Sequence, residues 1–273
     1  MFGYGDEKKS IDTASVSTQQ SEIPVFNKSQ VLVCTTHGKI YAVNKKDGSR
    51  LWRQDFPCSN LGGIVSLFVT DNDTIIVGGN GKTAAMDLYT GQTKWTNEMK
   101  GFGYDEVSVL ATPSRYLLPK IQPQVNHYDE AEAAGAPPSY EEQQIEKQMI
   151  FGCSRGKVLA LDSETGETAW KYDCPGGGYN IPTLLVEPPS HDTEHPFQVV
   201  YVGCGRWVYC LRALTGEVVW NVKVSNSMFG LGFMCLATPW SSRLTAEAHT
   251  SFSSAPLAQA REMERRKHSS GGG

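Results

Sequence analysis

The stretch GKVLALDSETGETAW, residues 156–170, decides the fold of this chain because its pattern occurs three more times. The other copies are GKIYAVNKKDGSRLW (38–52), GKTAAMDLYTGQTKW (81–95) and RWVYCLRALTGEVVW (206–220). In every copy a polar or charged residue is followed four positions later by Gly, and Gly four positions later by Trp. The repeated residues are Asn44, Gly48 and Trp52; Asp87, Gly91 and Trp95; Asp162, Gly166 and Trp170; and Arg212, Gly216 and Trp220. A fixed spacing in four copies indicates a repeat architecture.

Each copy predicts a hairpin between two β-strands. Alternate residues of KVLALD, such as Val158 and Leu159, fall on opposite faces of a strand, and both faces are largely apolar, which is typical of a strand between packed sheets. The Asp or Asn that follows can accept hydrogen bonds from the N–H groups of a turn, and Gly supplies a positive φ. The Trp on the returning strand is expected to cover the junction with a neighbouring unit. Arg212 breaks the acidic pattern, so we expect its turn to be held differently.

Further apolar runs precede the hairpins. One run directly upstream occurs in all four copies, at 31–35, 74–79, 149–154 and 199–205, and another further upstream occurs in three, at 64–70, 107–112 and 181–187. The sequence therefore predicts an all-β chain of four-stranded antiparallel units. Such units in series are the sequence sign of a β-propeller, whose blades bury their faces against one another.

The spacing of the repeat locates the parts outside the blades. The intervals between the repeat Trp residues are 43, 75 and 50, and the long one holds an insertion at 113–147 that is rich in Pro, Glu, Gln and Ala. We expect disorder in this insertion and in residues 1–21. Blades are expected within 22–240, and a tail with one short helix within 241–273.

Composition narrows the classes of function. The formal charge is −4 with mixed signs along the chain, which gives no basic field for nucleic acid and no polybasic segment for a membrane. The N-terminus lacks an apolar run of signal-peptide length, and the seven cysteines are odd in number without an adjacent pair or CxxC. These features predict a cytoplasmic protein with reduced thiols.

The form AxDxxTGxxxW resembles the repeat of the quinoprotein alcohol dehydrogenase-like superfamily, the PQQ-type β-propellers. ALDSETGETAW fits best, whereas YAVNKKDGSRLW has Asp47 where the family usually has Thr, and the resemblance covers about residues 30–240. The quinone enzymes of the superfamily carry adjacent disulfide-bonded cysteines over the cofactor and a bound calcium. This chain has no adjacent cysteines, so the resemblance implies a non-enzymatic member without a cofactor, and it assigns no catalytic or metal-binding residue.

Four complete copies imply about four blades, a partial or half propeller. A fifth copy begins at 228–240 and does not continue. Three architectures are possible: a half propeller that pairs as a homodimer, an open arc left by a truncated or incomplete chain, and a closed ring of four blades. An open arc would leave apolar blade faces uncovered at both ends.

One short motif suggests a partner. The insertion contains PPSY, with Pro137, Pro138 and Tyr140, which is the PPxY form bound by WW domains. The alternative is an ordinary Pro-rich linker. The sequence therefore favours an intracellular scaffold for protein–protein interaction, against the alternative of an oxidoreductase or small-molecule binder that uses the central channel.

Overall fold

The computed structural model describes residues 26–57, 65–114, 146–178, 180–189, 195–226, 234–239 and 241. Within them the chain forms one short 3-10 helix, η1 (Lys28–Gln30), and strands β1 to β15. The predicted all-β class is confirmed. Residues 1–21, the insertion between 114 and 146, and the tail after 241 lie outside the described residues, so the expectations about them stay predictions.

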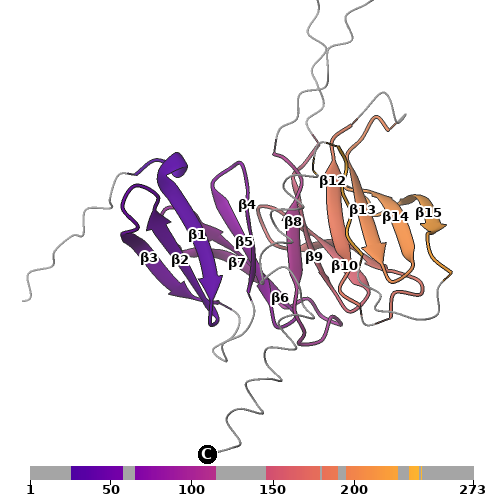
Figure 1. The fold of residues 1–273 in the computed structure, drawn as a ribbon, viewed down its shortest axis with the longest axis horizontal. Helices are drawn as coiled ribbons and strands as arrows, with labels where there is room; N and C mark the ends of the chain where they lie inside the picture. The colour runs from indigo at the N-terminus through magenta and orange to yellow at the C-terminus, as the bar shows by residue number, and fades with distance from the viewer. Residues whose placement is uncertain are drawn as a thin grey trace, which may run out of the picture.

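The strands form four antiparallel sheets in sequence order (Figure 1). Blade 1 has three strands, β1 (Val31–Thr36), β2 (Lys39–Asn44) and β3 (Arg50–Asp55). Blade 2 has four, β4 (Ser66–Val69), β5 (Thr74–Gly79), β6 (Lys82–Asp87) and β7 (Thr93–Asn97). Blade 3 consists of β8 (Ser108–Ala111), β9 (Met149–Ser154), β10 (Lys157–Asp162) and β11 (Thr168–Asp173). Blade 4 consists of β12 (Thr183–Glu187), β13 (Val199–Cys204), β14 (Trp207–Arg212) and β15 (Val218–Lys223).

Tight hairpins join the two middle strands of a blade. Between β5 and β6, Asn80 and Gly81 have φ of 51° and 68°, and Arg155 and Gly156 between β9 and β10 have φ of 50° and 69°. Two successive residues with positive φ are what a two-residue hairpin loop requires, because that turn matches the right-handed twist of the strands. The register is then regular, for example with Gly79 opposite Lys82 and Ser154 opposite Lys157.

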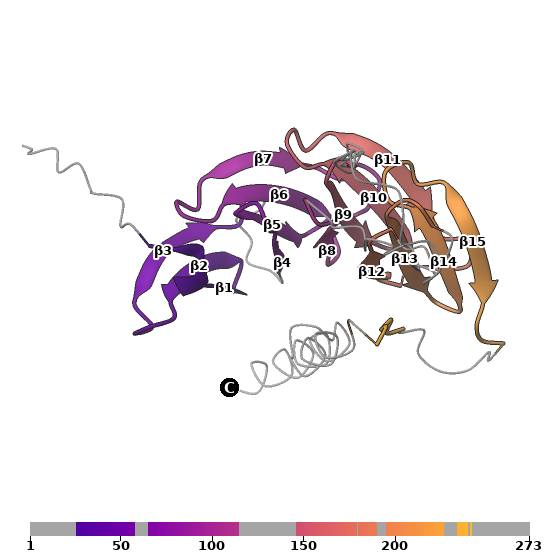
Figure 2. The same cartoon turned by 90° about the horizontal axis from the view of Figure 1, so that it is seen from above.

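The four sheets follow one another along an open arc. Figure 2 shows β4, β8 and β12 on the concave side and β3, β7, β11 and β15 on the convex side. We call the concave-side strand of a blade its inner strand. Blade 1 has no inner strand among the described residues, because its sheet order begins at β1.

The core lies between blades. All residues of β5 and β9 are buried, so these two strands are covered on both faces, as expected for the second strand of an internal blade. One apolar cluster joins blade 1 to blade 2 through Ile40, Ile75 and Met86. Another joins blade 3 to blade 4 through Phe151, Val158 and Leu211. Each blade therefore contributes to two cores, except at the two ends of the arc.

Candidate functional site

The repeat turns share one backbone conformation. The Asp162 carboxylate oxygen Oδ1 accepts hydrogen bonds from the N–H groups of Glu164 at 2.9 Å and Thr165 at 3.1 Å. Asp87 holds its turn in the same way, and Asn44 accepts from the N–H of Lys46 at 2.9 Å. The repeat glycines have φ between +69° and +74°, which is favourable only without a side chain: Gly48, Gly91, Gly166 and Gly216.

Arg212 replaces the acidic residue without changing the path of the main chain. The N–H of Gly216 donates to the carbonyl of Arg212 at 2.8 Å, as Gly166 does to Asp162 at 2.9 Å. The Arg212 side chain lies over the Phe197 ring, 4.8 Å from its centroid, and pairs with the Glu146 carboxylate at 3.8 Å. The difference at this turn is therefore in the side chain, which connects the turn to the loops around it.

Each repeat Trp that is followed by another blade docks onto the turn of that blade. The indole N–H of Trp52 donates to the carbonyl of Leu88, that of Trp95 to Ser163, and that of Trp170 to Ala213, all at 3.0 Å. The three acceptors take the same place in their turns, directly after Asp87, Asp162 and Arg212. One contact is thus repeated at all three blade junctions.

The repeat Gly also makes room for the Trp of the preceding blade. A Cβ at Gly91 would lie 2.8 Å from Cε3 of Trp52, and a Cβ at Gly216 would lie 2.6 Å from Cδ2 of Trp170. Gly166 is equally close to Trp95. The repeat Gly therefore has two structural roles. It allows the positive φ of the turn, and it leaves space for the Trp ring at the blade junction.

The two ends of the arc each present half of this junction. A Cβ at Gly48 would have nothing within 4 Å, because no blade precedes blade 1 among the described residues. At the other end, Trp220 is 38% exposed, whereas Trp95 is 8% exposed. The repeat Trp of blade 4 therefore has no turn to dock on in the described chain.

The base of the 113–147 insertion is fixed by polar contacts on one face of the arc. Ser114 donates to Asp71 Oδ2 from its N–H at 2.9 Å and from its hydroxyl at 2.7 Å. Gln148, where the chain returns, donates to Asp71 Oδ1 at 3.2 Å and to the carbonyl of Thr112 at 2.9 Å. A single carboxylate of blade 2 thus binds both ends of the insertion, which leaves and re-enters between the paired strands β8 and β9.

Two charged contacts continue this base across the face. Lys147 pairs with Asp162, and Glu146 accepts a hydrogen bond from the N–H of Gln198 at 3.0 Å besides its contact with Arg212. Burial raises the pKa of Asp162, but the Lys147 ammonium and the two turn N–H groups lower it more, and the net pKa lies below its ordinary value. The insertion face, as we name the surface formed by these residues, is therefore connected to blades 2, 3 and 4.

The predicted WW-binding residues Pro137, Pro138 and Tyr140 lie outside the described residues, in the C-terminal third of the insertion. Asp71, Glu146 and Gln148, which hold its base, were not identified from the sequence. Their partners are up to 77 positions away in the chain. The only local signal was the position of Arg212, where the repeat loses its acidic residue.

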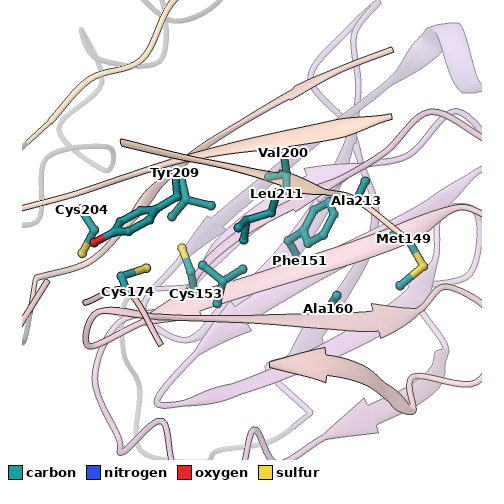
Figure 3. Packing of buried hydrophobic residues seen from close by; sticks show 12 residues of the cluster. Met149, Phe151, Cys153, Ala160, Cys174, Val200, Cys204, Tyr209, Leu211 and Ala213 are labelled. Carbon is teal, nitrogen blue, oxygen red and sulfur yellow. The ribbon is translucent and has the colours of Figure 1, made fainter. Parts of the chain in front are cut away.

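Three thiols gather between blades 3 and 4. Figure 3 shows the sulfur atoms of Cys153, Cys174 and Cys204 at one end of the apolar cluster, near the hydroxyl of Tyr209. The six cysteines of the described residues form no disulfide. Hydrogen bonding to Cys204 and burial raise the pKa of the Cys174 thiol, and burial raises that of Cys153. The hydrogen bond with Cys174 lowers the pKa of the Cys204 thiol. The cluster is therefore a set of packed thiols.

The described residues contain no group of three His, Cys, Asp or Glu side chains arranged to hold a metal ion. A cavity of about 450 Å³ lies between β1 and β4 and is lined mostly by apolar side chains, among them Leu32, Val33, Leu67 and Val69. No helix in the described part of the chain is long and apolar enough to cross a membrane.

Solved structures with a similar chain path come from several kinds of protein. BamB from Moraxella catarrhalis is 17% identical, with 71% of this chain and 46% of that chain covered and a TM-score of 0.42. Sqt1 from Saccharomyces cerevisiae is 11% identical, with 72% and 48% covered and a TM-score of 0.48. The quinohemoprotein alcohol dehydrogenase ADHIIG from Pseudomonas putida HK5 is 16% identical, with 71% and 33% covered and a TM-score of 0.44. The chain spans less than half the length of each.

Sequence comparison identifies the family. No curated protein matches the sequence at a significant level. The family model described as "Outer membrane protein assembly factor BamB" matches residues 9–177 and 154–234, which together span most of the chain. With the four-copy repeat and the arc of antiparallel blades, this match shows that the chain belongs to the family of PQQ-type repeat β-propellers that the model represents.

Proposed function

We propose that this protein is a non-enzymatic, cytoplasmic scaffold that binds a protein partner through the 113–147 insertion. The observation that carries the proposal is the base of the insertion. Asp71 binds Ser114 and Gln148 together, and Lys147 and Glu146 attach the returning chain to two further blades. A segment attached in this way is presented from a rigid support, an arrangement common for binding loops.

The partner class we propose is a WW domain. Pro137 and Pro138 favour the polyproline conformation at little entropic cost, and Tyr140 supplies an aromatic ring for the second slot of such a domain. The motif begins 23 positions after the anchored Ser114 and ends six positions before the anchored Glu146. A cytoplasmic setting suits the proposal, since WW recognition is an intracellular interaction and the buried thiols of Cys153 and Cys174 are stable where thiols stay reduced.

The first experiment replaces residues 115–145 by a short Gly- and Asn-containing turn. Because β8 and β9 are already paired at Ala111 and Ile150, the replacement should leave the blades folded, with an unchanged far-ultraviolet circular dichroism spectrum. A purified WW domain of the type that reads PPxY is then titrated by calorimetry into both proteins. Binding to the full chain and none to the shortened chain is the expected result.

The motif itself is tested within the complete insertion. Tyr140→Ala and Pro138→Ala should each weaken WW binding by roughly tenfold or more, the loss of about 1.4 kcal/mol expected for a side chain that fills a binding slot. Tyr128→Ala and Pro123→Ala are matched controls, since they change the same residue types in the same insertion outside PPSY. Equal affinity of all five proteins would contradict the proposed role of the motif.

A further inference from the structure

The thiols of Cys174 and Cys204 come from two different blades and meet where the chain passes from one blade to the next. Cys174 directly follows β11 of blade 3, and Cys204 is the last residue of β13 in blade 4. The two thiols share a hydrogen bond. A Cβ at Gly177 would lie 2.6 Å from the sulfur of Cys204 and 3.2 Å from Cβ of Cys174, so both side chains lie against this glycine. The two sulfur atoms need only a small further approach, to about 2.05 Å, to form a disulfide.

A third thiol lies beside this pair but has a different partner. Figure 3 shows the Cys174 side chain between those of Cys153 and Cys204. The Cys153 S–H donates to the carbonyl of Pro182 at 3.1 Å, and burial raises the pKa of this thiol. The Cys174 S–H donates to the Cys204 sulfur instead, and this hydrogen bond lowers the pKa of the Cys204 thiol. Cys204 is therefore the best nucleophile of the three, because the thiolate is the reactive form.

A turn of glycine backbone covers the Cys204 sulfur on one side. Cys204 is 1% exposed, and Gly177 packs directly on its sulfur. The neighbouring Gly176 and Gly178 are exposed and have φ of 78° and 57°. Because glycine has no side chain, only main-chain atoms of this turn lie over the sulfur. A molecule close to water in size can therefore reach the thiols when the turn opens locally, without separation of the blades.

We propose that Cys174 and Cys204 form a reversible redox site that joins blade 3 to blade 4 covalently when the protein meets hydrogen peroxide. The Cys204 thiolate attacks one peroxide oxygen and the O–O bond breaks, which leaves a sulfenic acid and a hydroxide that takes up the proton lost by Cys204. The Cys174 thiol then attacks the sulfenic sulfur, the S–O bond breaks and a second water leaves. Two thiols and one hydrogen peroxide thus give one disulfide and two waters. Exchange with a dithiol restores both thiols.

The disulfide converts a non-covalent blade junction into a covalent one. Cys174 and Cys204 are 30 positions apart, and the loop that they close contains β12 and β13. Closing a loop restricts the unfolded chain, so the oxidised protein should be the more stable form, with a thermal unfolding midpoint higher by roughly 5–10 °C. A disulfide of this kind suits a reducing compartment, where such bonds are transient and redox-sensing.

The linkage is tested first in the native chain. Reduced protein is treated with increasing hydrogen peroxide until the exposed thiol of Cys34 is oxidised, and the remaining thiols are then alkylated in denaturant. The peptides of an unreduced digest are identified by mass spectrometry. The expected result is a pair of peptides linked through Cys174 and Cys204, which dithiothreitol separates. Recovery of both as alkylated thiols, or a link from Cys174 to Cys153, would overturn the proposal.

Single variants connect the linkage to stability. Cys174→Ala and Cys204→Ala should each abolish the rise of the unfolding midpoint on oxidation. Cys210→Ala is the matched control and should keep the rise, since Cys210 is also completely buried but lies outside the cluster of Cys174 and Cys204. Variants are compared only if their reduced forms unfold cooperatively, and otherwise the map of the native chain decides. A rise of the native size in Cys174→Ala or Cys204→Ala would mean that another pair of cysteines causes it.

Discussion

At the residue scale, the four repeat glycines have the same backbone conformation and different neighbours. Gly48 and Gly166 both have φ of +72°, but only Gly166 lies against the Trp of a preceding blade. The pair therefore separates the conformational requirement for Gly from the packing requirement. The sequence predicted the first requirement at each position, but the second depends on the Trp of another blade, which for Gly166 is Trp95, 71 positions earlier in the chain.

Replacing these glycines by Ala should show the two requirements separately. Gly48→Ala should cost about 1–2 kcal/mol, the penalty of an L-residue in the left-handed region. Gly166→Ala should cost about 1–3 kcal/mol more, because its Cβ would overlap the Trp95 ring. The free energy of unfolding of both variants and of the native chain is measured in urea. Equal losses would mean that the ring moves aside freely.

Asp162 gives a residue-scale prediction of pH dependence. Its pKa in the folded chain lies below the ordinary value of 3.8, so its contribution to stability is present above that value and is lost as the pH falls through the folded pKa. Asp162→Asn keeps an oxygen for the turn N–H groups and loses the charge beside Lys147. The variant should be less stable than the native chain at pH 7, and the difference should disappear in strong acid. A difference that persists unchanged at pH 2 would contradict this assignment.

At the scale of elements, the sequence predicted most of the strands. It did not explain why blade 1 has no inner strand among the described residues. The runs at 74–79 and 149–154 coincide with β5 and β9, because both faces of these strands are buried and their apolar pattern is continuous. The run at 31–35 had no second run before it, and no inner strand pairs with β1 in the part of the chain that the structure describes. The polar base of the insertion was not predictable, since Asp71 and Gln148 belong to different blades and no periodicity connects them.

The repeat Trp of an internal blade, Trp95, should contribute more to the free energy of unfolding than Trp220 of the terminal blade 4. Trp95→Ala should lower the free energy of unfolding by about 3–5 kcal/mol, as expected for a large buried aromatic side chain. Trp95→Phe keeps most of the packing and should cost about 1 kcal/mol for the lost hydrogen bond to Ser163. Trp220→Ala is the matched change at a Trp without a following blade among the described residues, and it should cost much less than Trp95→Ala.

At the scale of the whole molecule, stability should decrease from the middle of the arc toward its ends. Each blade contacts mainly its neighbours, so internal blades have two stabilising interfaces and terminal blades have one. The buried β9 and the partly exposed β1 are equivalent strands in the two situations. The difference between them follows from position in the arc and not from strand sequence alone.

Amide hydrogen exchange tests this gradient. The amides of β9 should exchange more slowly than those of β1, because exchange in β1 requires only the terminal blade to open. Residue-level mass spectrometry can compare the two strands in one sample. Equal protection of β1 and β9 would indicate that the arc opens as a single cooperative unit.

The double contact of Asp71 also makes the chain suitable for division into two fragments. Ser114 and Gln148 are held by the same carboxylate, beside strands that are already paired. A cut between 115 and 145 would therefore separate the covalent chain without separating β8 from β9. The two halves, expressed as independent polypeptides, should reassemble through this ladder, and reporters fused to the new termini would then record when blade 3 forms.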